Sequence, residues 1–293
     1  MGDNKCVSAA QFRSPLAFAA IARQVKQMRL TAIEETRRSW PAPWARRLAV
    51  LSLAVLVVGL VTHWLQLLAT PAFFWSMALA AAMALAALFL IAIATPKVWY
   101  LGYVGGRDLI RAGIFATLVL VPFALATVWA VTHPMLTDVS TDLDDPPVFD
   151  EAAKLRAPDM NPLLSASDAW KAEQLDAYPQ VGGRRYEAPI EAVRGAVEKV
   201  FEARGWTPLG PYIAGAAPEY TLETTIYSLG LALPSDLVVR MIGDDEATFV
   251  DMRAASRYGD TDFGGNAELI VEFFKELDIA VSTMARVAPA PAQ

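Results

Sequence analysis

The side chains with the clearest chemical potential lie in the C-terminal half of the chain. Guanidinium groups bind carboxylates and phosphates through paired hydrogen bonds, and a helix N-terminus attracts the same anions. The pattern therefore indicates a small polar site for a carboxylate, a phosphate or a lipid headgroup. The candidate ligand-binding residues are arginines with carboxylates, a serine and an asparagine around them: Arg240, Arg253, Ser256, Arg257, Asp262, Asn266, Asp138 and Asp142.

The same side chains also fit a purely structural role. The three arginines would then join the sheet, the following loop and the opening segment of the domain through carboxylates, and Asp262 or Asn266 would cap the last helix. A side chain that caps a helix satisfies free backbone N–H groups and contributes about 1 kcal/mol. Because ion-pair networks resemble functional sites in charge-based reasoning, we place this interpretation first. An open cleft over Arg253, Arg257 and Asp262 would instead indicate a binding site.

Calcium binding is a variant of the binding interpretation. The side chains of Asp260, Asp262, Asn266 and Glu268 have a spacing that partly resembles a calcium-binding loop. Such a loop carries a bidentate Glu at its twelfth position, and Val271 stands there in this chain. We therefore expect no metal and no other cofactor.

Catalysis is limited by the residue types that the end of the chain lacks. Residues 134–293 contain no His and no Cys, which excludes a Ser-His or Cys-His nucleophile and a typical zinc site there. Two carboxylates can act as acid and base when burial separates their pKa values. A hydrolase built on a group of three carboxylates and an arginine therefore stays open as an alternative: Asp138, Asp142, Asp262 and Arg253.

A predicted β-hairpin positions most of these candidates. Strands expected at 235–242 and 247–255 flank residues 243–246, whose glycine and three acidic residues are a hairpin turn signal. Side chains alternate between the two faces of a strand. One face is therefore expected to be apolar and to form the core, with Leu237, Val239, Met241, Thr248, Val250 and Met252.

The charged residues occupy the opposite face of this hairpin. Pairing the two ends of the turn predicts that Asp236 faces Arg253 directly and that Arg240 lies diagonal to Asp251. Opposite charges then alternate across the face. The hairpin thus predicts ion pairs between the two strands.

The remaining pattern predicts an α+β domain with an antiparallel sheet and helices packed on one face. Residues 138–149 contain two prolines and should run extended. Three or four strands are expected, the first at 220–227. The helices are expected at 149–156 and 165–177, as short pieces, at 189–204, closed by Gly205, and at 265–284.

Three apolar runs precede this domain, at about 48–68, 72–94 and 110–131. Each run is long enough, at about 1.5 Å per helical residue, to cross the ~30 Å hydrocarbon layer of a bilayer. We expect three transmembrane helices in the range 48–133, after a basic and partly amphipathic segment at 1–47. No Asp, Glu, Lys or Arg lies deep inside a run, which argues against a transporter.

The distribution of charge predicts the orientation. Residues 1–47 contain nine Lys or Arg and three Asp or Glu, whereas residues 134–293 contain 13 and 27. Lys and Arg near the spans stay in the cytoplasm, so the N-terminus is expected inside and the domain at 134–284 outside. An acidic external domain also argues against nucleic acid as a partner. Residues 285–293 are expected to be a disordered tail.

The segment from Asp251 to Ala267 resembles the signature of a family of domains of unknown function, number 1499. The resemblance covers residues 138 to about 284. It implies a bacterial envelope or plastid setting, often with membrane spans, and no established activity. Ala254 and Ser235 replace a Ser and an Asp that are usual in the family. The signature residues map onto Arg253, Ser256, Arg257, Gly259, Asp262, Gly264 and Asn266.

Together these features predict a non-catalytic envelope protein, anchored in the bacterial inner (plasma) membrane by several spans. Its N-terminus is expected in the cytoplasm and its C-terminal domain in the periplasm. The lipid bilayer is one expected partner, and the domain is expected to bind an envelope protein or a small anionic ligand. The alternative function is an envelope hydrolase that uses the carboxylate–arginine cluster.

Overall fold

The structure is a computed structural model that describes residues 23, 37–163, 167–210, 213–214 and 219–287. Two compact units divide the chain, residues 1–53 with 82–118 and residues 54–81 with 119–293. The expected amphipathic segment before residue 37 and the end of the expected tail, residues 288–293, lie outside the described residues.

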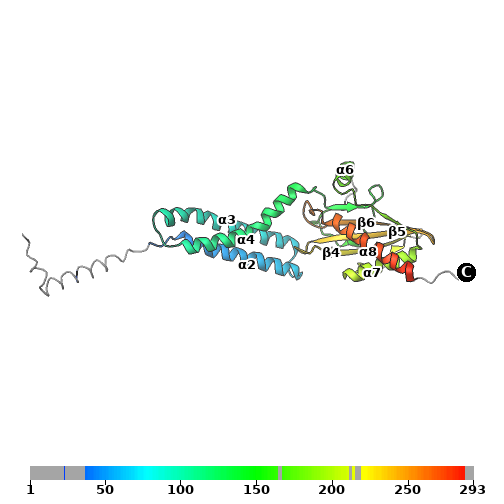
Figure 1. Ribbon diagram of the computed structural model, residues 1–293, viewed down its shortest axis with the longest axis horizontal. Helices are drawn as coiled ribbons and strands as arrows, with labels where there is room; N and C mark the ends of the chain where they lie inside the picture. The colour runs from blue at the N-terminus through cyan, green and yellow to red at the C-terminus, as the bar shows by residue number, and fades with distance from the viewer. Residues whose placement is uncertain (1–22, 24–36, 164–166, 211–212, 215–218, 288–293) are drawn as a thin grey trace, which may run out of the picture. The chain divides into compact units, whose positions relative to one another are not determined.

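Three long helices occupy the first half of the chain (Figure 1). They are α2 (Pro41–Trp64), α3 (Thr70–Tyr100) and α4 (Gly106–Thr132), with hydropathies of 1.9, 2.6 and 2.3 in their most apolar windows. The prediction of three helices long and apolar enough to cross a membrane is confirmed. All three begin before the expected spans. Pro41 starts α2, where its missing N–H needs no partner.

Within the first unit, polar contacts join the start of α2 to the segment that precedes α4. The Ser39 N–H donates to the carbonyl of Val104 at 3.1 Å. Arg46 lies 3.3 Å from Asp108. Asp108 is in the first turn of α4, where a negative charge is favourable.

The second half of the chain forms the α+β domain that the sequence predicts. Its elements are β1 (Asp138–Ser140), α5 (Glu151–Lys154), α6 (Asp168–Ala177), β2 (Arg184–Tyr186), α7 (Ile190–Arg204), β3 (Ile213–Ala214), β4 (Glu219–Tyr227), β5 (Pro234–Gly243), β6 (Thr248–Ser256) and α8 (Gly265–Val287). The strand order is β1-β6-β5-β4-β3, with β2 also pairing with β6. All these pairs are antiparallel.

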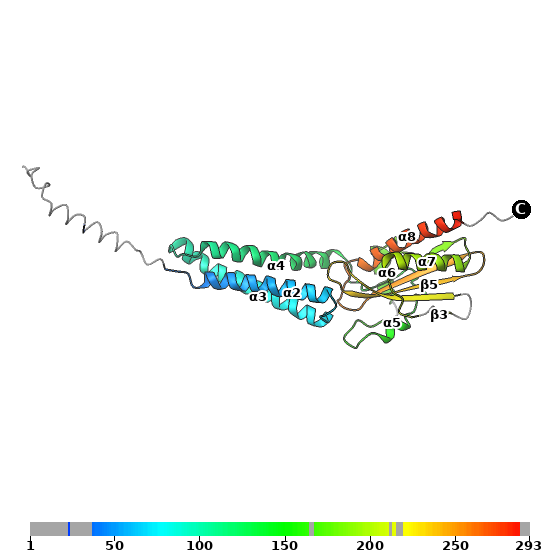
Figure 2. The ribbon, with the colours of Figure 1, turned by 90° about the horizontal axis from the view of Figure 1, so that it is seen from below.

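The two faces of the sheet are covered by different helices. Figure 2 shows α7 and α8 on one side of the strands and α5 on the other. The helix-covered face forms the main apolar core. The six residues expected on this face of the hairpin are all 0% exposed, which confirms the prediction.

Helix boundaries follow the sequence signals closely. Gly205 ends α7 in the left-handed conformation, with φ 66°, as expected for a glycine just after a helix. Helix α8 begins at the expected Gly265 and continues to Val287, three residues into the segment expected to be a tail.

The predicted register of the β5–β6 hairpin is wrong by two residues. Gly243 pairs with Thr248, so Arg240 faces Asp251 directly and Asp236 faces Ala255. The turn is longer than expected because the Asp244 carboxylate accepts the N–H groups of residues 246 and 247. A shift of two residues leaves every side chain on its predicted face, and for this reason the core was still identified.

The outer edge of the sheet is a strand in two pieces. Both β1 and β2 pair with β6, β1 at residues 253–255 and β2 at residues 248–250. The chain leaves this edge after Ser140 and returns at Arg184, after forming α5 and α6. Neither piece was predicted, because three residues are too few to show a strand pattern.

Candidate functional site

Arg253 of β6 binds the segment that opens the domain. Its Nε and Nη2 atoms donate to the two oxygens of Asp138, at 2.8 and 2.6 Å. Its Nη1 donates to the carbonyl of Pro147 at 3.2 Å, and its guanidinium lies 5.3 Å from the ring centre of Phe149. The two-pronged pair is a strong and directional contact. Arg253 therefore fixes residues 138–149 on the sheet.

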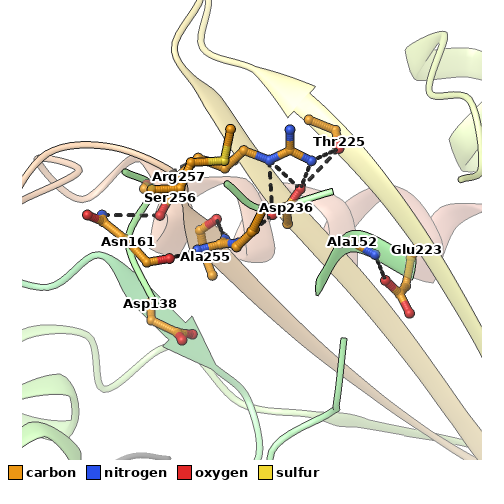
Figure 3. Close-up of polar contacts among 12 residues, drawn as sticks. Asp138, Ala152, Asn161, Glu223, Thr225, Asp236, Ala255, Ser256 and Arg257 are labelled. Atoms are coloured by element: carbon orange, nitrogen blue, oxygen red, sulfur yellow. Dashed lines mark hydrogen bonds and ion pairs between the residues drawn. The ribbon is translucent and has the colours of Figure 1, made fainter. Parts of the chain in front are cut away.

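Asp236 of β5 pairs with two arginines, Arg156 and Arg257; Figure 3 shows its contacts with Arg257 and Thr225. Arg257 Nη2 donates to Asp236 Oδ1 at 2.7 Å, and Arg156 Nε donates to Asp236 Oδ2 at 2.8 Å. The Thr225 hydroxyl also donates to Asp236 Oδ1, at 3.0 Å. Asp236 is 0% exposed, so this carboxylate is stable as a charge only while its donors remain.

Arg240 of β5 is surrounded by three carboxylates. It lies 2.8 Å from Asp145, 3.1 Å from Asp142 and 3.5 Å from Asp251. Its Nη2 also donates to the carbonyl of Asp145 at 2.8 Å. Arg240 thus holds the 142–145 turn against the sheet.

The signature residues around the start of α8 form a separate polar group. The Asp262 carboxylate accepts the N–H groups of Gly264 at 2.9 Å and Asn266 at 2.7 Å. The Asn266 amide donates to the Ser256 hydroxyl and to the carbonyl of Thr137, both at 3.0 Å. Asp262 is therefore the cap of the last helix, and burial raises the pKa of its carboxyl group. Asn266 ties the helix to the end of β6 and to the strand that enters the domain.

The structure distributes the candidate residues among these separate contacts. Arg253 takes Asp138, Arg240 takes Asp142, and Arg257 takes Asp236, which was not a candidate. The guanidinium groups are mostly buried and already paired. This is the arrangement that a scaffolding role requires, and an anion would have to displace a carboxylate to enter.

Sequence reasoning missed several residues that complete the network. Glu223 of β4 is 4% exposed and accepts the N–H groups of residues 150–152 at 2.7 to 3.2 Å. Gln174 of α6 bonds both the N–H and the carbonyl of Ser140. Arg156 and Asn161 contact β6 across about a hundred residues of sequence. Partners this far apart in the sequence leave no local signal. Glu223 is the exception, because a glutamate in a strand expected to be half-buried could have indicated a buried charge.

Metal binding and acid–base chemistry find little support in this geometry. Within the described ranges, no group of three or more His, Cys, Asp or Glu side chains is placed to hold a metal ion. Both oxygens of Asp262, the residue shared by the calcium and hydrolase hypotheses, accept backbone N–H groups. The other two carboxylates of the hydrolase hypothesis bind different arginines.

An open cleft lies beside the network, where the edge strand is interrupted. Its volume is about 640 Å³, within the ~300–1,000 Å³ range of ligand pockets. Residues 249–251 of β6, the segments 141–144 and 183–185, and two residues of α6, Lys171 and Leu175, line it. A side chain at Gly183 would overlap the carboxylate of Asp251, so only glycine allows the returning chain to come this close.

The two arginines of β2, Arg184 and Arg185, are less completely paired than those of the network. Arg184 makes no ion pair with any described residue and lies 5.5 Å from the ring centre of Phe274. Arg185 pairs with the exposed Glu187 and lies 5.6 Å from the ring centre of Phe249. Phe249 is 53% exposed. Side chains alternate along β2, so the Arg184 guanidinium lies on the α8 side of the sheet and the Arg185 guanidinium lies beside Phe249 on the opposite face. The cleft therefore offers the guanidinium group of Arg185 and an aromatic surface to a ligand.

Fold and network define a class of protein, in which three apolar helices precede an antiparallel α+β domain secured by arginine–carboxylate pairs. Residues 138–277 match the family described as protein of unknown function (DUF1499). The resemblance that the signature indicates is therefore confirmed for the α+β domain.

Other comparisons add little. No curated protein is detectably similar in sequence to the chain. Among solved structures, the chain is similar to CalU16 from Micromonospora echinospora, at 16% identity over 37% of this chain and 74% of that protein, with a TM-score of 0.24. A TM-score of this size is too low to support an inference.

Proposed function

We propose that the protein is a non-catalytic, membrane-anchored envelope protein whose C-terminal domain binds a protein partner or a small anionic ligand in the cleft beside β2. The arginine–carboxylate network is the scaffold that forms this cleft. The observation that carries the proposal is the contrast between the buried arginines of the network, each held by at least one carboxylate, and the exposed Arg185, whose partner is the exposed Glu187.

The chemistry of the cleft favours a ligand that carries negative charge. The Arg185 guanidinium lies 5.6 Å from the ring centre of Phe249 and is exposed to an acceptor. Phe249 gives an apolar surface next to this arginine. Aromatic and arginine side chains are the residues that most often dominate binding energy at protein interfaces. An acidic segment of a partner and a small anion would use the same donors.

The proposed location is the bacterial inner membrane, with the N-terminus in the cytoplasm and the α+β domain in the periplasm. The excess of Lys and Arg before the first helix and between the second and third helices supports this orientation. A cysteine at exposed Asp245, in a Cys6→Ser background, tests it. Labelling by a membrane-impermeant maleimide in cells with a permeabilised outer membrane is expected, and protection until lysis would contradict the orientation.

Photocrosslinking in the native envelope tests the binding function. A photoreactive phenylalanine analogue at Leu175, which is 58% exposed in the cleft, is expected to form a discrete adduct with a partner. The matched control is Ile279 of α8, which is 66% exposed outside the cleft. The adduct at Leu175 should disappear with Arg185→Glu, because charge reversal repels an acidic ligand.

A parallel assay covers small ligands. The full chain in nanodiscs is melted with phosphate, with citrate and without addition, as wild type, Arg185→Ala and Arg257→Ala. A shift in the melting temperature that Arg185→Ala alone abolishes would support an anion site in the cleft. No adduct and no shift at millimolar anion would overturn the proposed cleft.

A further inference from the structure

The turn between β4 and β5 differs in composition from the rest of the domain. Residues 226–235 carry no charged side chain, although the domain from residue 134 onward contains 13 Lys or Arg and 27 Asp or Glu. Leu229, at its tip, is 99% exposed, and Tyr227 and Leu231 are 50% and 36% exposed. A leucine this exposed, with a second leucine and a tyrosine beside it, is an apolar surface without cover.

The turn has an ordered conformation. The Ser228 hydroxyl accepts the N–H of Leu233 at 3.0 Å, and the Ser228 N–H donates to the carbonyl of the same residue at 3.0 Å. The Ala232 N–H donates to the carbonyl of Ser228 at 2.9 Å, with Ala232 at a φ of 52°. These bonds hold Leu229 outward, so its exposure is a property of the fold.

The turn lies at the end of the sheet where the chain enters the domain from α4. Strand β5 leaves the turn with Ser235 paired to Ser256, and the entering strand pairs Asp138 with Ala255. The segment between α4 and β1 bonds to the same end, because Thr261 donates to the carbonyl of Pro134 and Asp262 donates to that of Leu136. The few residues from Thr132 to Asp138 span at most about 20 Å when extended.

The other hairpin turn of the sheet provides an internal contrast. Residues 244–247, between β5 and β6, lie at the opposite end of the sheet and include three acidic side chains. The end that is tied to α4 thus carries the apolar turn, and the distant end carries the acidic one. This polarity is what a domain resting on a bilayer would require.

We propose that the 228–233 turn inserts Leu229 and Leu231 into the interfacial layer of the bilayer that holds α4. The inference rests on the membrane anchoring in the proposed function. Leucine side chains gain free energy when they leave water, and tyrosine is favoured at the level of the headgroups. The domain then meets the membrane at two places, the end of α4 and this turn, which limits its rotation about the anchor.

Spin-label accessibility in the full chain tests this proposal. Single cysteines in a Cys6→Ser background are labelled at Leu229, at Asp245 of the acidic turn and at Leu125 of α4, and the protein is reconstituted in vesicles of phosphatidylethanolamine and phosphatidylglycerol. The ratio of oxygen to nickel-chelate collision rates rises with depth in lipid. We expect this ratio to be several-fold higher at Leu229 than at Asp245, and highest at Leu125.

The controls separate the possible failures. A Leu229 label as accessible to nickel as the Asp245 label, with Leu125 deep in lipid, would overturn the inserted turn and leave the anchoring intact. A water-accessible Leu125 label would overturn the anchoring itself. Protection of Leu229 that disappears on dilution into excess lipid would show that a second copy covers the turn, which also overturns the proposal.

Discussion

The two faces of the sheet are secured by different forces, and neighbouring residues of β5 demonstrate the difference. Leu237 points into the apolar core under α7 and α8, whereas Asp236 points to the opposite face and meets two guanidinium groups. Both residues are 0% exposed. Apolar burial is non-directional and depends mainly on area. Ion pairs depend on position, so the charged face determines where residues 138–161 lie on the sheet.

The largest expected effect is that of Asp236→Ala. Removal of this carboxylate leaves Arg156 and Arg257 buried beside each other without a counter-charge, and breaking such a buried pair costs about 3–5 kcal/mol. Hydrogen exchange of the β5 and β6 amides, in the full chain in nanodiscs, measures the loss. Asp260→Ala, at an exposed position of the loop after β6, is the matched control and should change little.

A triple replacement sharpens the same comparison. Exchanging Asp236, Arg156 and Arg257 together for leucine or methionine removes all three charges, and buried ion pairs replaced by apolar groups often cost nothing. We expect the triple variant to be more stable than Asp236→Ala. If the triple variant is as unstable as Asp236→Ala, the three charged side chains stabilise the domain by more than neutralising one another.

Leu237→Ala tests the apolar face at the adjacent position. Truncation of a fully buried leucine is expected to cost about 3 kcal/mol through lost transfer energy and the cavity that remains. The loss should be insensitive to salt and pH because no charge is involved. Melting of the variant and the wild type at low and high salt checks this, and a salt-dependent difference would contradict the division between the faces.

Glu223→Gln should have a smaller and more local effect. The glutamate carboxylate accepts three backbone N–H groups at the start of α5. A hydrogen bond to a charged acceptor contributes about 1.5–3 kcal/mol to stability, and part of this remains when a neutral acceptor replaces the charged one. Glutamine keeps one acceptor oxygen, so we expect a loss of about 1–2 kcal/mol. Faster hydrogen exchange confined to residues 150–154 would report it, and an unchanged rate there would contradict it.

The smallest predicted effect is a pH dependence at Asp262. Burial raises its pKa above the ordinary value of 3.8, so the folded domain takes up a proton more readily than the unfolded chain. The resulting stabilisation is complete below pH 3.8 and is lost as the pH rises through the folded pKa. Asp262→Asn cannot titrate, so its melting temperature relative to wild type should rise from pH 4 to pH 7. A pH-independent difference would refute this.

Much of the fold could be predicted from local patterns, and most of the site could not. The apolar face of β5 and β6 follows from alternation, and the end of α7 follows from Gly205, because both signals lie within a few residues. The register of the hairpin could not be predicted from alternation alone, because it depends on the Asp244 side chain, whose hydrogen bonds to two N–H groups lengthen the turn. No pattern around Arg156 indicates a partner 80 residues away in sequence.

The cleft illustrates the same limit. Arg184 and Arg185 follow two glycines in an ordinary loop sequence, and Arg185 comes to line a cleft only because Gly183 passes close to Asp251. That approach depends on the path of the chain through α5 and α6. The sequence signature, in contrast, consists of residues with scaffolding contacts, so the strongest motif did not point to the open surface.

The pairing of the first strand with the last determines the order in which the domain can be completed during synthesis. Asp138 and Arg253 are 115 residues apart in sequence, and contacts between such distant residues form slowly. As the chain is synthesised, the segment that follows α4 emerges first, and β1 has no partner until β6 follows. We therefore expect residues 138–140 to be among the last parts of the sheet to become fixed.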